Sequence, residues 1–482
     1  NQATARADEL KMVSDFQAEM LAQINPTKAG DELTADVAAK FAEALAKANP
    51  PISESERARM EAIFERHWER INTTDAAREL IDRTILRPSV ETIEAQFADQ
   101  PVVAAQLRQA LATQYHTLGL FDAAEPLQVS ALETRRRVLG DDHPDTLASI
   151  HEMGILLQGQ GRNSEAESFF LEALEKRRRV LGDEHPDTLL SINGMQFLYQ
   201  GQGMLAEAEP YALEVLETRR RVLGEEDVHT MLSISNMCVL LMYQGKLDEA
   251  EPLCREAMEK RRRVLGEKSG DTVISINILA YLLQAQGKYD EAEPLRFEAV
   301  EKSRQVFGSE HPDTLIAVNN LGWFLQVLGR LDEAEPYHVE ALEIYTRVLG
   351  DEHPNTLYTV VCLGALRTAQ GRYAEAIEFL EPVEPGVRAT FTGAFAHVLA
   401  RYLMSVGRAR AGLGFDPEGF ATAEADLIEA HELYVASRGE EDRGTRTCVK
   451  ALADLYDEWA KAAPGRGYED RAEEWKAVVA AS

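Results

Sequence analysis

One stretch of the sequence recurs at a fixed interval and limits the folds that this chain can adopt. The stretch RRRVLGDEHPDTL occupies residues 177–189, and related versions begin at residues 135, 219, 261, 303 and 345, each 42 residues after the one before. A self-similar period of this size is typical of repeat proteins, in which each unit buries its apolar face only by stacking on its neighbours. The chain is therefore expected to be a linear array of small units.

Two sets of glycines mark the ends of two helices in each unit. Between them lie apolar residues at helical spacing, such as Leu189, Ile192 and Met195. The first set is Gly140, Gly182, Gly224, Gly266, Gly308 and Gly350, and the second is Gly119, Gly161, Gly203, Gly245, Gly287, Gly329 and Gly371. An alanine follows five residues after each glycine of the second set, which predicts close contact between helices. The second set counts seven repeats.

The His-Pro-Asp-Thr motif predicts where the first helix of a repeat begins. Proline is tolerated in the first turn of a helix, and an acidic residue there favours the positive end of the helix dipole. His143, His185, His311 and His353 are therefore expected to lie at helix entries. A metal or catalytic role would require them to converge, whereas a repeat array spreads equivalent positions along its axis.

These patterns predict an all-α fold, a right-handed α-solenoid of about seven 42-residue helix-turn-helix repeats with helical caps at both ends. We expect an N-terminal helical cap or connector over residues 1–98, the repeat array over 99–382, and degenerate repeats with a capping hairpin over 383–482. The cap shows helical spacing over residues 10–24 and 60–71. Residues 381–386 (EPVEPG) predict a turn-rich break.

Composition excludes several classes of function. Lys and Arg number 51 against 81 Asp and Glu, a net charge of −30, which disfavours binding to nucleic acid or anionic membranes. The four cysteines (Cys238, Cys254, Cys362 and Cys448) lack CxxC spacing and are expected to be reduced and buried. No membrane span, signal peptide, cofactor motif or metal motif is visible. We expect a cytoplasmic protein that is not an enzyme.

The repeat resembles the 42-residue tetratricopeptide repeat of the kinesin light chain type. The features that carry the resemblance are an asparagine and leucines in the first helix, Q-G-[KR]-[YL]-x-E-A-E-P-L, and L-G-x-x-H-P-D, matched by residues 275–295 and 304–315. This resemblance covers roughly residues 100–382 and implies a protein-binding scaffold. Residues 16–26 (FQAEMLAQINP) and the closing hairpin with Trp459 and Trp475 resemble, more loosely, the regions that flank such repeats in bacterial serine/threonine kinases.

The resemblance implies that the first helices line a concave groove that binds an extended peptide. Amide side chains there can pair with a peptide backbone, and aromatic side chains can form pockets. The candidate groove residues are His151, Asn193, Phe197, Asn236, Asn277, Tyr281, Gln284, Asn319, Asn320, Trp323 and Gln326. The alternative is that some of these asparagines only bond across neighbouring helices.

The Arg-Arg-Arg runs at 135–137, 177–179, 219–221 and 261–263 allow two interpretations. They could form a stripe along the solenoid that binds acidic ligands. Glu133, Glu175, Glu217 and Glu259 lie two residues before each run, so glutamate could instead pair with arginine three and four positions later on the same helix. We favour this second interpretation, an ordinary solvated face.

Two functions follow from these observations. The first is a non-enzymatic scaffold that binds a protein or an extended peptide segment in the groove. The alternative is a regulatory or substrate-recruiting C-terminal region of a larger bacterial signalling enzyme such as a serine/threonine kinase. The start at Asn1 rather than Met favours a fragment, and the sequence contains no glycine-rich nucleotide loop, H-R-D or D-F-G, so a kinase domain would lie upstream.

Overall fold

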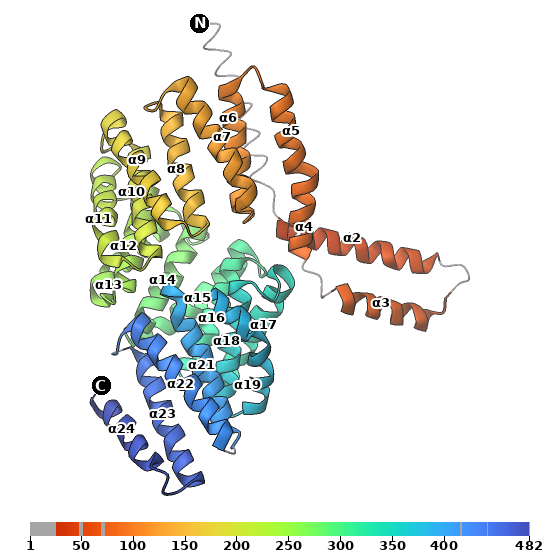
Figure 1. The fold of residues 1–482 in the computed structure, drawn as a ribbon, viewed down its shortest axis with the longest axis vertical. Coiled ribbons are helices and arrows are strands. Elements are labelled where there is room, and N and C mark those ends of the chain that lie inside the picture. Colours follow the sequence, from red (N-terminus) through yellow and green to blue (C-terminus); the bar gives the residue numbers. More distant parts are fainter. Residues whose placement is uncertain (1–25, 48–51, 69–72, 415–416, 441, 482) are drawn as a thin grey trace. The chain divides into compact units, whose positions relative to one another are not determined.

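The computed structural model describes residues 26–47, 52–68, 73–414, 417–440 and 442–481, and the regular structure in these ranges is entirely helical (Figure 1). The all-α prediction is confirmed. The helix expected over residues 10–24, and nearly all of FQAEMLAQINP, fall outside the described residues. The chain forms two compact units, residues 1–253 and 254–482, which are considered one at a time below.

The first unit begins with a helical cap and continues as helix pairs. The cap holds α2 (Pro26–Ala46), α3 (Glu54–Trp68), α4 (Thr73–Ile81), the π-helix η1 (Asp82–Leu86) and α5 (Arg87–Gln96). The pairs are α6 (Pro101–Thr117) with α7 (Phe121–Leu139), α8 (Pro144–Gly159) with α9 (Asn163–Leu181), and α10 (Pro186–Gly201) with α11 (Leu205–Val222). They are followed by α12 (Val228–Tyr243) and α13 (Leu247–Val264), and α13 carries the chain into the second unit.

The second unit continues with three such pairs and closes with two further helical hairpins. It contains α14 (Gly270–Ala285) with α15 (Tyr289–Phe307), α16 (Pro312–Val327) with α17 (Leu331–Leu349), and α18 (Pro354–Ala369) with α19 (Tyr373–Leu380). Then come η2 (Glu381–Val383), α20 (Glu384–Thr390), η3 (Gly393–Phe395), α21 (Ala396–Gly412) with α22 (Pro417–Arg438), and α23 (Arg443–Ala462) with α24 (Tyr468–Ala481). The break expected at 381–386 is present, because α19 ends at Leu380 and the short η2 follows it. It is helical rather than turn-rich, since both prolines there lie in first turns, where helices tolerate them.

Local chemistry explains why each first helix begins where it does. The His143 Nδ1 atom accepts a hydrogen bond of 3.1 Å from the Asp145 N–H, and His185, His311 and His353 cap their helices in the same way. The placement of these histidines at helix entries is confirmed. The buried Thr146 hydroxyl donates to the Gly140 carbonyl at 2.8 Å, and Gly140 itself has a φ of +89°, which favours glycine.

Close contact between helices is also confirmed. The alanines five residues after each second-set glycine are all 0% exposed; they are Ala124, Ala166, Ala208, Ala250, Ala292, Ala334 and Ala376. A methyl group at these positions lets two helix backbones approach, and the larger apolar residues around it fill the remaining space.

The first arginine of each run is buried, contrary to the solvated-face interpretation. Arg177 is 3% exposed, and its Nη1 donates to the Asp187 carbonyl at 2.9 Å and to the Ser191 Oγ at 2.8 Å. Arg135, Arg219 and Arg261 make the equivalent pair of bonds to a carbonyl ten residues later and a serine fourteen residues later. Each arginine therefore joins the end of one repeat to the first helix of the next.

The other arginines pair between repeats rather than along their own helix. The Arg136 Nη2 lies 2.7 Å from a Glu172 carboxylate oxygen, and Arg304 pairs with Glu340 at the same distance and spacing. Arg179 and Arg221 each pair with an acidic residue 37 positions earlier. Among the described residues, Glu133, Glu175, Glu217 and Glu259 form no ion pair, so the predicted pairing within each helix is wrong.

The cysteine prediction is wrong in part. Cys362 and Cys448 are free and buried, as expected, but Cys238 and Cys254 are disulfide-bonded. The reason is that spacing along the chain does not show which side chains helix packing brings together.

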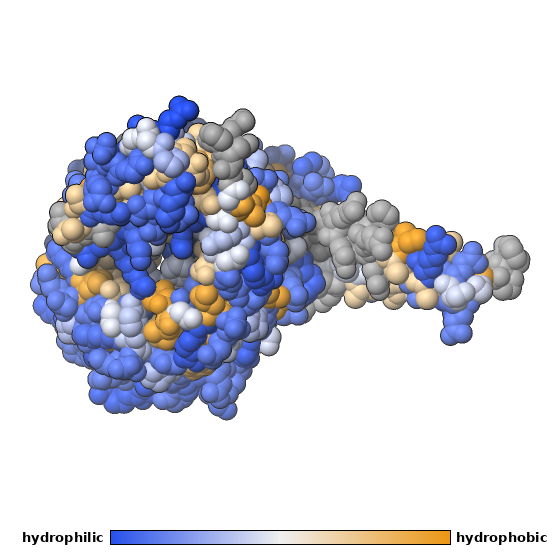
Figure 2. Space-filling model, turned by 90° about the horizontal axis from the view of Figure 1, so that it is seen from below, coloured by the Kyte–Doolittle hydropathy of each residue, from blue (hydrophilic) through white to orange (hydrophobic). Residues whose placement is uncertain are grey.

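None of the described helices is long and apolar enough to cross a membrane. The face in Figure 2 is largely hydrophilic, with separate hydrophobic patches.

We expect the substitution Arg177→Met to destabilise the protein by about 1–3 kcal/mol, because it leaves a buried serine hydroxyl and a carbonyl without a donor. The matched control is Arg137→Met, which changes an exposed arginine of the preceding run and should cost less than about 0.5 kcal/mol. Urea unfolding followed by helical circular dichroism measures both. Equal losses for the two variants would contradict the bridging role of Arg177.

Candidate peptide-binding face

The first helices of consecutive repeats contact one another and form one surface within each unit, which we call the first-helix face. In the first unit α8 contacts α10, and in the second unit α14 contacts α16, which contacts α18. The predicted groove residues lie on these helices and on α12.

Two of the first helices, α10 and α14, each present two exposed apolar side chains with an asparagine between them. On α10, Leu190 is 47% exposed and Phe197 is 43% exposed. These residues are seven positions apart, two helical turns, so they lie on the same side of the helix. On α14, Ile274 and Tyr281 repeat this arrangement. Asn193 and Asn277 occupy the position between the apolar pair on α10 and α14, respectively.

In the first unit, two of the predicted amides are available to a ligand. Asn193 is nearly buried and Asn236 is half-buried, and neither side chain has a hydrogen-bond partner in the part of the chain that the structure describes. His151 is different: it is 8% exposed, and its ring lies 5.3 Å from the Phe170 ring. Burial, and secondarily the Arg177 charge, lower the His151 pKa to about 3, which makes it a neutral core residue.

In the second unit, the side-chain amides of Asn277 and Gln284 are hydrogen-bonded to an arginine that sequence reasoning missed. The Arg296 side chain is 1% exposed and donates to the Asn277 Oδ1 at 2.9 Å and to the Gln284 Oε1 at 2.7 Å. Its guanidinium lies 5.8 Å from the centre of the exposed Tyr281 ring. Burial lowers the Arg296 pKa to about 10, so the side chain remains charged at neutral pH.

The side-chain amide of Asn319 is likewise hydrogen-bonded within the protein. Its Oδ1 lies 2.5 Å from the Nδ1 of His338, which is fully buried. Burial, and then the charge of Arg401, lower the His338 pKa to about 4, so the ring is neutral and its Nδ1–H donates to the amide. Replacing both Asn277 and Asn319 with alanine would therefore remove a hydrogen-bond partner from two buried side chains and would perturb the core together with any binding site.

The remaining predicted residues of the second unit are half-buried. Asn320 has no hydrogen-bond partner within the described ranges, and the Gln326 Oε1 is buried without one. Trp323 lies under the guanidinium of Arg401 on α21, 4.0 Å from the ring centre. The Arg401 Nη1 also donates to the Tyr358 hydroxyl at 3.3 Å and contacts the Cys362 Sγ at 3.7 Å.

Arg401 was missed because its repeat is shifted by one residue. Gly407 lies 43 residues after Gly364, not 42, and both glycines face a leucine of the paired helix so closely that a Cβ would clash with it. Aligned on these glycines, Arg401 follows Ile274, Ile316 and Tyr358 in the outer apolar position of the first-helix face. The recurrence of this glycine at Gly407, after 43 residues, was the sequence signal that could have revealed the position of Arg401.

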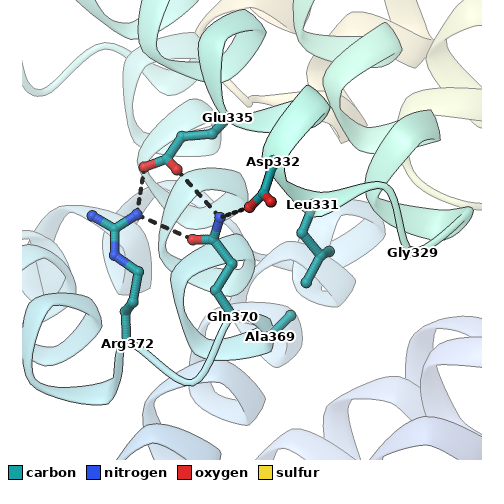
Figure 3. A pocket seen from close by; sticks show the side chains of 7 residues that line it. All are labelled: Gly329, Leu331, Asp332, Glu335, Ala369, Gln370 and Arg372. Carbon is teal, nitrogen blue, oxygen red and sulfur yellow. Dashed lines mark hydrogen bonds and ion pairs between the residues drawn. The ribbon is translucent and has the colours of Figure 1, made fainter.

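A surface hollow in the second unit is formed by contacts between repeats and is not part of the first-helix face. Figure 3 shows Arg372, Gln370, Glu335 and Asp332 converging at its edge. The Arg372 Nη1 lies 2.7 Å from the Glu335 Oε1, and the Gln370 Nε2 donates to the other carboxylate oxygen at 3.2 Å. Because these polar groups bond to one another, the hollow offers no unpaired group for a ligand.

The same network joins other repeats. Glu125 accepts from Gln160 and Arg162, and Glu209 accepts from Gln244 and Lys246. The glutamine and the basic residue come from the Q-G-[KR] motif of one repeat. The glutamate comes from the repeat before, where Glu209 is the second glutamate of E-A-E and Glu125 ends the matching A-A-E. The motif therefore describes a contact between repeats.

Comparison with known proteins identifies the family. The tetratricopeptide repeat profile matches residues 103–179, 146–221, 227–295, 272–326 and 319–383, more than half of the chain. The chain belongs to the tetratricopeptide repeat family. No curated protein matches the sequence.

Three solved structures illustrate the similarity of fold. The apo quorum sensor NprR from B. thuringiensis is 16% identical, with 77% of this chain and 97% of that chain covered and a TM-score of 0.50. Apo RapI is 14% identical, with 78% and 96% covered and a TM-score of 0.50. A putative kinesin light chain from Podosopora anserina is 24% identical, with 41% and 94% covered and a TM-score of 0.38. Identities this low show the fold alone.

The tetratricopeptide network makes stability depend on pH. Hydrogen bonds from Lys246 and then Gln244 lower the Glu209 pKa in the folded state. A lowered carboxyl pKa contributes stability that is present above the unfolded pKa of about 4.3 and is lost as pH falls through the folded value. We expect Glu209→Gln to cost about 0.5–1 kcal/mol at pH 7, with the difference from the parent shrinking as the pH falls below about 4.3.

Urea unfolding of both proteins across this pH range measures the effect. Glu133→Gln changes an exposed glutamate that has no ion pair in the described residues, and it serves as the control. A difference between Glu209→Gln and the parent that stays constant from pH 7 to pH 3 would contradict the network.

Proposed function

We propose that this chain is a non-enzymatic scaffold that binds an extended segment of a partner protein on its first-helix faces. The observation that carries the proposal is the exposure of Phe197 and Tyr281 at the same position of their repeats. Each lies two turns from a second exposed apolar residue on its own helix. Exposed apolar groups arranged in rows on a repeat surface are typical of interaction sites.

The chemistry of these faces suits an extended peptide. Such a peptide has backbone N–H and C=O groups that need partners, and its side chains point alternately to opposite sides. Asn193, Asn236 and Asn320 offer amides that both donate and accept. The apolar residues on either side of these amide positions would contact the peptide side chains. Covering one such apolar side chain gains roughly 1 kcal/mol, since about half of it is already buried.

Similarity of fold gives limited support. NprR, whose fold is similar, is a quorum sensor, but one repeat fold serves many unrelated ligands, so this likeness is an analogy. The proposal therefore rests on the residues of the faces. A cytoplasmic location, expected from the sequence, belongs to the same proposal.

A second proposal is that the chain recruits substrates for, or regulates, a larger bacterial signalling enzyme such as a serine/threonine kinase. Its support is the resemblance of FQAEMLAQINP and the closing hairpin to regions that flank kinase-linked repeats. Sequencing the gene upstream of the codon for Asn1 tests this proposal. An upstream reading frame without a kinase domain would rule out a kinase as the larger enzyme.

We expect Phe197→Ala and Tyr281→Ala each to weaken peptide binding about 5- to 30-fold, the effect of removing an aromatic anchor. The measurement is retention of a pool of random amidated decapeptides on the immobilised full chain, followed by titration of the peptides that are recovered. Val180→Ala is the matched control, because Val180 is 42% exposed on a second helix. Equal retention by the Phe197, Tyr281 and Val180 variants would place binding elsewhere.

A further inference from the structure

Arg401 is a cation on the first-helix face of the second unit that lacks an acidic partner. It is half-buried, and its guanidinium lies 4.0 Å from the Trp323 ring centre and 5.7 Å from that of Tyr358. It donates to the Tyr358 hydroxyl at 3.3 Å and contacts the Cys362 thiol at 3.7 Å, and the buried Tyr434 side chain is a further hydrogen-bond partner. Within the described ranges no carboxylate lies within ion-pair distance of Arg401.

Several other arginines of the same unit are paired with carboxylates. Arg372, Arg388 and Arg410 lie 2.6–2.7 Å from a carboxylate oxygen of Glu335, Glu429 and Asp426, respectively. The chain carries 81 acidic residues, so partners are abundant. Removing an unpaired guanidinium from water costs free energy, and hydroxyls and a thiol offset that cost only weakly.

Arg296 adds a second such cation to this face. Its hydrogen bonds go to the amides of Asn277 and Gln284, and its Nε is buried without a partner in the described residues. Tyr358 interacts electrostatically with both Arg296 and Arg401. The face therefore carries two positive charges that its own side chains do not neutralise.

We propose that Arg401 binds a side-chain carboxylate, from Asp or Glu, of the peptide segment that crosses this face. The proposal rests on the proposed function and names the chemistry of its ligand. A guanidinium stacked on an aromatic ring keeps its edge available, and that edge matches the two oxygens of a carboxylate. A side chain fits better than a peptide terminus because the helices continue beyond Arg401, where α21 contacts α23.

The test uses amidated random decapeptide pools with a fixed central Glu, Gln or phosphoserine, retained on the immobilised full chain. We expect the parent to retain the Glu pool about tenfold better than the Gln pool, the effect of one charge-assisted bidentate pair. Arg401→Gln should abolish this preference, and Arg401→Lys should leave part of it. Arg367→Gln is the matched control, because the Arg367 guanidinium lies 4.7 Å from the Phe379 ring centre and should not affect the preference.

The possible outcomes separate the carboxylate inference from the scaffold proposal. Equal retention of the Glu and Gln pools by the parent, or an unchanged preference in Arg401→Gln, would overturn the inference while leaving the scaffold proposal standing. Stronger retention of the phosphoserine pool would overturn the assignment to a carboxylate. Retention of none of the pools would overturn the proposed function together with the inference. Circular dichroism checks that each variant folds, and if Arg401→Gln does not, the parent ratio and Arg401→Lys decide.

Discussion

Each of the early repeats depends on a buried arginine that it shares with the next repeat. The guanidinium is too costly to bury alone, and it is retained because a serine hydroxyl and a backbone carbonyl accept its hydrogen bonds. The chain itself shows this dependence. Arginine at residues 135, 177, 219 and 261 is matched by serine fourteen residues later, but where Ser303 replaces the arginine, Ala317 replaces the serine. The cation and its acceptor thus disappear together.

The fold could be predicted because its requirements are local and repeated. Gly140 and Gly161 take backbone conformations that favour glycine, and His143 caps the helix that Pro144 begins, so each leaves a mark at a fixed place in the sequence. The hydrogen-bond partners of Arg177 could not be predicted from the sequence in this way. Its glutamate neighbour, Glu175, is visible in the sequence, whereas its actual partner, Ser191, is identified only by how helices pack.

The candidate face was predicted by position but not by bonding. The repeat register places Asn277 and Asn319 on first helices, and they are there. Whether their amides are available depends on Arg296 and His338, which lie on second helices where the register predicts nothing about polar contacts. By contrast, the rings of Phe197 and Tyr281 are exposed on first helices.

The ionic contacts between repeats have a consequence for how such a chain can change over generations. Glu125, Glu209 and Glu335 each accept from the motif of the following repeat, 35 and 37 residues later. At each of these junctions the acceptor is a glutamate and the donors are a glutamine and a basic residue, Arg or Lys. Loss or duplication of one whole 42-residue unit from the gene would therefore rejoin an equivalent glutamate to an equivalent basic residue. An array built in this way can lengthen or shorten by recombination without inventing a new junction.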